Sequence, residues 1–149
     1  RYQEILASQI PVVALPGNAG TVRVIAGEFE GAKGPARTFT PIQVWDLSLS
    51  GDRPIDLDVP DRFTTALVVL KGSARVKGFD AIEASEVGLF DRAGTRITID
   101  DAKGVRALLL CGEPIDEPIV GSGPFVMNTA QEIRQAAEDY RSGRMGRLS

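Results

Sequence analysis

The side chains that most enzymes use for catalysis are scarce in this sequence, because its 149 residues include no histidine and one cysteine. Without an imidazole, the chain cannot build a Ser-His-Asp or Cys-His catalytic group. It also cannot build a histidine zinc site or a two-His-one-carboxylate iron site. The single thiol, Cys111, excludes an intrachain disulfide and a cysteine zinc cluster. We therefore expect this chain to bind no transition metal.

Carboxylates are the remaining candidates for chemistry. Adjacent Asp116 and Glu117 could form a metal or acid–base site, but the two prolines of residues 113–118 favour a rigid turn whose carboxylates accept from local amides. Oxygen ligands suit Ca²⁺ or Mg²⁺, and a cation site could draw on five other acids. None of them has the spacing of a calcium loop, so we expect a solvated surface for Glu28, Glu30, Glu83, Glu86 and Asp91.

Two further side chains could contact a ligand but are predicted to be structural. Cys111 ends the apolar run 107–110 and has no histidine or evident basic neighbour, which favours a small buried hydrophobe over a reactive thiol. Trp45 is predicted to lie in the core rather than to form a stacking platform.

Charge argues against a nucleic-acid partner. The formal net charge is −3, from 17 Lys and Arg against 20 Asp and Glu, whereas a general nucleic-acid binder presents a basic surface. The C-terminal arginines could contact nucleic acid, but three charges on an acidic domain are expected only to solvate a terminus. They are Arg141, Arg144 and Arg147.

Size and composition are those of a single globular domain. A chain of this length can bury a core without a metal or disulfides, and 43% of its residues are hydrophobic. Its longest apolar runs hold about five residues, whereas a membrane helix needs about 20, so we expect no membrane partner. One unpaired cysteine is typical of a reducing compartment, which favours the cytoplasm.

Short segments with period-2 alternation, separated by 16 glycines and 9 prolines, predict an all-β sandwich or barrel. In residues 44–49, Trp45 and Leu47 share one face and Asp46 lies on the other. In residues 55–59 the apolar residues alternate with two aspartates. The segment 66–77 predicts a hairpin that turns at Gly72, with its first strand, 67–70, buried on both faces. Further strands are predicted at 21–25, 87–90, 96–99 and 105–111, and a loop at 27–35.

One helix is predicted over residues 130–142. Thr129 and Glu132 form a capping box, and Gly143 supplies a left-handed stop. Counted from Ile133, apolar residues at i, i+3, i+4 and i+7 form a stripe along one face of this helix. We predict that this stripe contacts a partner barrel or the chain's own barrel, and its residues are Ile133, Ala136, Ala137 and Tyr140.

The C-terminal part of the chain resembles the pirin family. The resemblance rests on the run Gly-Glu-Pro-Ile-Asp-Glu-Pro-Ile at 112–119, on Gly-Pro-Phe-Val-Met-Asn-Thr at 123–129, and on Gly-Arg-Met-Gly at 143–146. Earlier pieces agree, among them Arg-Val-Ile-Ala-Gly at 23–27, so the resemblance covers nearly the whole chain.

The resemblance implies a cupin, a jelly-roll antiparallel β-barrel, with one C-terminal α-helix. On this interpretation residues 1–128 form the barrel, and residues 129–149 are the helix and basic tail of the same domain. Pirins are bicupins in which the N-terminal barrel carries the metal, usually iron, and the C-terminal barrel is generally metal-free. The start at Arg1, without an initiator Met, favours a domain fragment over a one-barrel relative, and both remain open.

Two functions follow from the resemblance, and a third possibility is a small-molecule binder that uses the barrel interior. The first is a non-catalytic scaffolding or binding module, whose partner is the N-terminal cupin of the same protein or a second copy of the chain in a homo-oligomer. The alternative is part of a quercetin 2,3-dioxygenase-like enzyme, whose metal lies in a barrel that this chain lacks; alone, the chain is expected to be inactive. Eukaryotic pirins act in the nucleus, which makes a nuclear location a second expectation beside the cytoplasm.

Overall fold

The computed structural model describes residues 3–51, 53–78 and 80–146. They belong to two compact units, the first ending at Pro114 and the second beginning at Ile115. The described residues form mostly β-strands, with one α-helix near the C-terminus, as predicted. The predicted division at residue 128 remains a prediction, although the structure groups the helix with the strands that precede it.

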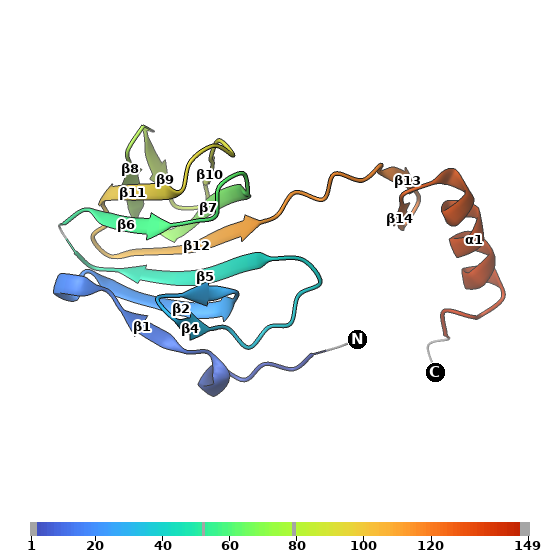
Figure 1. Cartoon of the computed structure of the whole chain (residues 1–149), viewed down its shortest axis with the longest axis horizontal. Helices are drawn as coiled ribbons and strands as arrows, with labels where there is room; N and C mark the ends of the chain where they lie inside the picture. The colour runs from blue at the N-terminus through green and yellow to red at the C-terminus, as the bar shows by residue number, and fades with distance from the viewer. Residues whose placement is uncertain (1–2, 52, 79, 147–149) are drawn as a thin grey trace. The chain divides into compact units, whose positions relative to one another are not determined.

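A six-stranded antiparallel sheet forms one layer of the first unit (Figure 1). Its order is β1-β2-β5-β12-β7-β10. The longest strands lie at its centre, where β12 pairs with β5 and β7 along its length. The bounds are β1 (Val12–Ala14), β2 (Gly20–Ala26), β5 (Ile42–Leu49), β7 (Thr64–Lys71), β10 (Val87–Leu89) and β12 (Val105–Gly112).

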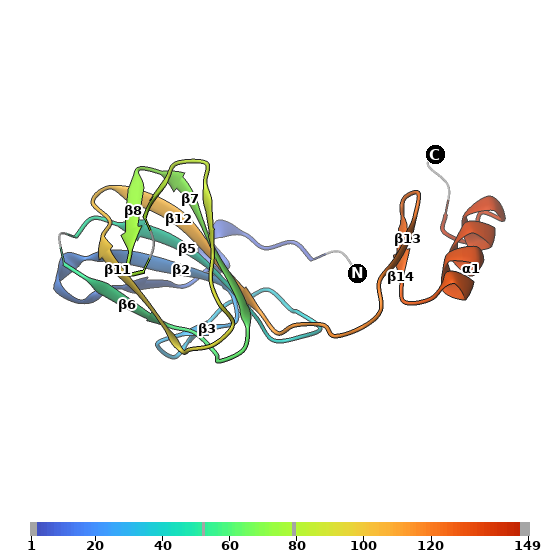
Figure 2. The same ribbon diagram turned by 90° about the horizontal axis from the view of Figure 1, so that it is seen from above.

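A four-stranded sheet, in the order β6-β11-β8-β9, forms the second layer (Figures 1 and 2). Its strands are β6 (Ile55–Asp58), β8 (Ser73–Val76), β9 (Ala81–Glu83) and β11 (Arg96–Asp101). The predicted loop at 27–35 contains a small hairpin, β3 (Glu28–Phe29) with β4 (Ala32–Lys33), which turns through positive φ at Glu30 and Gly31. Two short 3₁₀ helices, Ala7–Gln9 and Pro16–Asn18, flank β1.

The core lies between the two sheets, where alternate residues of the strands pack their apolar side chains against the other layer. In β6, Ile55 and Leu57 are buried while Asp56 and Asp58 are exposed, as the alternation predicts. In β5, Trp45 is 2% exposed and packs edge-on against Phe29, with ring centroids 4.9 Å apart. The prediction that Trp45 belongs to the core is confirmed.

Two predictions about the segment 66–77 are wrong. First, β7 and β8 do not pair with each other, because the chain crosses at Gly72 from one sheet to the other. Gly72 has the positive φ of 79° that the sequence suggested, but it makes a corner, where a Cβ would lie 3.2 Å from the Gly104 carbonyl oxygen. Second, β7 is buried on one face only, and Leu70 is 50% exposed.

The second unit is a hairpin and a helix (Figure 2). Strands β13 (Val120–Ser122) and β14 (Phe125–Met127) pair, and α1 (Ala130–Arg141) contacts both. The capping box is confirmed, since the Glu132 amide donates to Thr129 Oγ1 at 3.2 Å and the Thr129 amide donates to Glu132 Oε2 at 2.9 Å. Ser142 caps the end of the helix, and Gly143 follows with φ 78°.

Candidate functional site

A cavity of about 240 Å³ opens at one end of the first unit, where both sheets contribute to its wall. We call it the end cavity. Its wall is mixed. The larger apolar side chains that line it include two aromatic rings and are Val59, Phe63, Leu89, Phe90 and Ile97. The polar side chains that line it are Thr65, Asp91, Arg92 and Arg96. A small-molecule site combines apolar and aromatic side chains with a few polar groups, and this cavity holds both kinds.

The most buried polar side chain that lines the end cavity is that of Thr65, which is 2% exposed. It donates a hydrogen bond to Cys111 Sγ at 3.2 Å. Cys111 is itself 2% exposed, which confirms the predicted buried position. Burial raises the pKa of the Cys111 thiol, and the Thr65 hydrogen bond offsets part of this rise because it favours the thiolate. The thiol is therefore protonated at neutral pH and a poor nucleophile.

The raised pKa of Cys111 predicts a pH effect on stability. Because the folded chain holds the thiol proton more tightly, this contribution is fully present below the pKa of the unfolded thiol, about 8.5. Above that value the free energy of unfolding should fall by up to about 1.4 kcal/mol per pH unit, until the folded pKa is reached. Urea unfolding of the wild type and of Cys111→Ala at several alkaline pH values measures it. The prediction fails if both proteins lose stability equally.

Arg96 lines the end cavity, and its guanidinium is held by two aspartates of the neighbouring strand β6. Its Nε donates to Asp58 Oδ1 at 2.9 Å, and its Nη1 lies 3.8 Å from Asp56 Oδ2. The hydrogen bond to Asp58 and the charges of Asp58 and Asp56 raise the pKa of Arg96. The guanidinium is thus a fixed positive charge that could attract an anion, and it cannot serve as a base.

The side chains of the end cavity do not fit a transition metal. Its oxygen donors are Thr65 and Asp91, and the chain has no imidazole to complete an iron or zinc site. Among the described residues, no three histidine, cysteine or carboxylate side chains are grouped to hold a metal ion. No catalytic step is therefore assigned to a metal in this chain.

The predicted surface acids are exposed, as the sequence suggested. Glu83 accepts from Ser73 Oγ at 2.8 Å across the β8–β9 pair, and Glu86 accepts from the Glu83 amide at 2.8 Å in a local turn. Glu28 pairs with Lys33 at 3.8 Å. Exposed too are Glu30, Asp91, Asp116 and Glu117, and Glu117 accepts from the Asn128 side chain.

One carboxylate is buried. Asp46, on the strand face opposite Trp45 as predicted, is 6% exposed. It lies between two arginines on neighbouring strands, with Arg23 Nη1 3.1 Å and Arg106 Nη2 3.1 Å from its Oδ2. Only strand pairing reveals this cluster, since Arg23 and Asp46 are register partners while Arg106 pairs with Ser48, two residues further along β5 on the same face.

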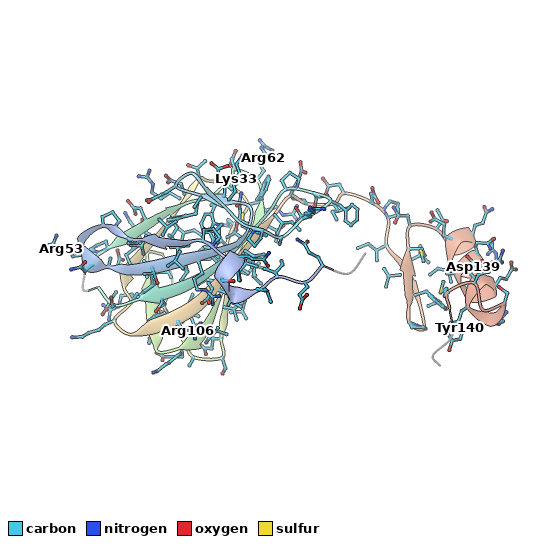
Figure 3. All side chains as sticks on the ribbon, turned by 90° about the horizontal axis from the view of Figure 1, so that it is seen from below. Lys33, Arg53, Arg62, Arg106, Asp139 and Tyr140 are labelled. Atoms are coloured by element: carbon cyan, nitrogen blue, oxygen red, sulfur yellow. The ribbon has the colours of Figure 1, made fainter. Side chains whose placement is uncertain are left out.

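The predicted helix stripe packs on the hairpin of its own unit. Ala136 is buried, and Ile133 and Ala137 are half-buried. Tyr140, labelled in Figure 3, is 69% exposed. Its ring lies edge-on to Phe125 at a centroid distance of 6.3 Å. The large destabilisation expected on truncating a fully buried tyrosine therefore does not apply to Tyr140. Contact of this stripe with a partner stays a prediction.

The basic tail is only partly described. Arg144 pairs with Asp139 at 2.7 Å, and Arg147 lies outside the described residues. Within the described part of the chain, no helix is long and apolar enough to cross a membrane.

Comparison with known proteins gives a consistent result. The family model of the Pirin C-terminal cupin domain matches residues 44–146. A protein of Pseudomonas aeruginosa named "Putative quercetin 2,3-dioxygenase" is 45% identical over 97% of this chain and 50% of its own length. Human Pirin is 32% identical over 98% of this chain and 51% of its own length.

A solved structure shows the same likeness to quercetin 2,3-dioxygenases. The crystal structure of a quercetin 2,3-dioxygenase from Acinetobacter baumannii aligns with all of this chain and 52% of its own, with a TM-score of 0.90 and 40% identity. The chain therefore spans about half the length of the relatives it matches.

Proposed function

Because the chain belongs to the pirin family, we propose that it is a metal-free cupin barrel of the C-terminal type, a non-catalytic module that binds and supports a second cupin. The second cupin carries the metal, as in the bicupin organisation that the resemblance implies. The relatives are about twice as long as the residues that match here, which leaves length for another barrel. The two facing sheets support the barrel architecture.

The observation that carries this proposal is the chemistry of the end cavity. In a cupin that activates a metal, imidazoles and a carboxylate converge between the sheets, as the resemblance implies. Here Thr65, which lines the end cavity with Phe63 and Phe90, bonds to the protonated thiol of Cys111 behind it in the core. These groups can bind a small apolar molecule, but none of them is a general base or an activated nucleophile.

A dioxygenase role is the second candidate, and the names of the relatives favour it. Relatives that are 45% and 40% identical are named as quercetin 2,3-dioxygenases. On this alternative the activity belongs to the longer protein, and this chain contributes a wall or a support to the metal-bearing half.

Elemental analysis and oxygen uptake test the proposal. The purified, untagged chain should contain less than stoichiometric iron, nickel, copper or zinc after dialysis against chelator. It should also consume no oxygen with quercetin, with or without added Fe²⁺. Asp91→Asn, which removes the carboxylate at the cavity, should behave identically. One metal per chain, or oxygen uptake that scales with chain concentration and falls in Asp91→Asn, would contradict the proposal.

A further inference from the structure

The end cavity has a closed inner part and an open mouth. Its inner wall is formed by the buried side chains of Val59, Thr65 and Ile97, which are at most 9% exposed. At the mouth lie exposed side chains, among them the apolar Leu89 at 65% and the charged Arg92. A molecule in this cavity therefore has one end among buried groups and the other beside charges in water.

The volume of the end cavity suits a single ring. It is about 240 Å³, whereas an engineered cavity of about 150 Å³ in another protein holds benzene. Sites for drug-sized ligands are larger, roughly 300–1,000 Å³. Phe63 and Phe90 line the cavity, pack against the core and are only half-buried. Because aromatic rings attract one another edge-on or offset, an aromatic ring is the apolar part that fits best.

Hydrogen-bond donors outnumber acceptors among the charged side chains of the wall. Arg92 makes no hydrogen bond or ion pair with its guanidinium among the described residues. Arg96 donates its Nε to Asp58, and a guanidinium carries five N–H donors in all. Asp91 is the one carboxylate among the described lining residues. This balance favours a ligand that accepts hydrogen bonds, and the planar fork of an arginine matches a carboxylate.

The position of the donors fixes the orientation of such a ligand. In the inner wall the polar side chain is Thr65, and its hydroxyl donates to Cys111 Sγ. A carboxylate therefore finds its donors at the mouth, on Arg92, and the apolar end of the molecule points inward toward Phe63 and Phe90. The reverse orientation would bury a charge without a partner, which is costly.

We propose that the end cavity binds a monocyclic aromatic carboxylate, with its ring beside Phe63 and Phe90 and its carboxylate on Arg92. This function goes beyond the scaffolding role and does not depend on it, because the acid needs neither a second cupin nor a metal. Asp91 repels the carboxylate and so limits the affinity of the site.

Isothermal titration calorimetry with benzoate tests this proposal on the full chain, in buffer that contains chelator. We expect saturable binding of one benzoate per chain, and weaker binding of benzyl alcohol, which has the same ring and no charge. Arg92→Gln should raise the benzoate dissociation constant by at least about tenfold, because it removes a charge-assisted hydrogen bond. Asp91→Asn should lower the constant, because it removes the repelling charge.

Arg53→Gln is the matched control. Arg53, which Figure 3 labels at the left end of the first unit, is also exposed and does not line the cavity. This variant should bind benzoate as the wild type does. A thermal melt checks the folding of each variant, and the three substitutions replace exposed side chains, so we expect the fold to be kept.

Three results would overturn the proposal. The first is a folded wild type that binds no benzoate at millimolar concentration. The second is the same loss of affinity in Arg92→Gln and in Arg53→Gln. The third is tighter binding of benzylamine than of benzoate, with a loss in Asp91→Asn, which would make the cavity a site for cations. None of these results alters the metal content or the oxygen uptake that test the scaffolding role.

Discussion

Replacement of Trp45 by alanine is expected to lower the free energy of unfolding by about 3–5 kcal/mol, the range for a large aromatic residue removed from a core. Trp45 is 2% exposed and belongs to the cluster that both sheets share. Its ring also packs edge-on against Phe29, and such pairs contribute beyond the area they bury. Urea unfolding followed by circular dichroism measures the change, because the substitution removes the chain's one tryptophan.

Two control variants test whether the loss in Trp45→Ala comes from removing a buried ring from the core. Phe39 is fully exposed, so Phe39→Ala should change the free energy of unfolding by less than about 0.5 kcal/mol. Trp45→Phe keeps most of the ring and removes the buried Nε1, which has no hydrogen-bond partner in the described structure. It should therefore cost much less than Trp45→Ala, since an unsatisfied buried donor is itself unfavourable. Equal losses in the two Trp45 variants would contradict this account of the core.

Replacement of Asp46 by alanine should have the second largest effect, a loss of about 2–3 kcal/mol. Removing one member of a buried ion pair costs about 3–5 kcal/mol because the remaining charge loses its partner. The expected loss is smaller here, because Arg23 and Arg106 are partly solvated. Urea unfolding again provides the measurement, with Asp46→Asn as a smaller change that keeps the shape of the side chain.

Asp58→Ala is the matched control for Asp46→Ala. Asp58 also pairs with an arginine, Arg96, at 2.9 Å, but its side chain is 74% exposed. Water screens such a pair, so the free energy of unfolding should stay close to the wild-type value. If Asp46→Ala and Asp58→Ala destabilise the chain to the same extent, burial is not the reason that the Asp46 cluster matters.

Local sequence patterns were sufficient to predict many of the strands and the helix. Composition was sufficient to exclude catalysis by histidine. Alternation in residues 55–59 predicted which face is buried, because side chains in a strand point to opposite sides with a period of two. Thr129, Glu132 and Gly143 predicted both ends of the helix, because capping depends on residues within one turn. The absence of histidine excluded imidazole chemistry in any fold.

Other features depended on pairing between distant strands. Gly72 has the φ that the sequence suggested, yet it joins two sheets rather than two strands of a hairpin, because β12 and β10 are the partners of β7. The ion cluster of Asp46 likewise depends on strand pairing, which brings Arg23 and Arg106 beside it.

The surfaces open to partners were likewise decided by the tertiary structure. The apolar run of β7 predicted burial on both faces, but one face remains open because no second layer of the first unit covers it. The helix stripe had to be covered, and the hairpin β13–β14, which the sequence did not predict, covers it. Composition and local spacing determine which elements form, whereas contacts between residues far apart in the chain determine what each element buries and what it leaves exposed.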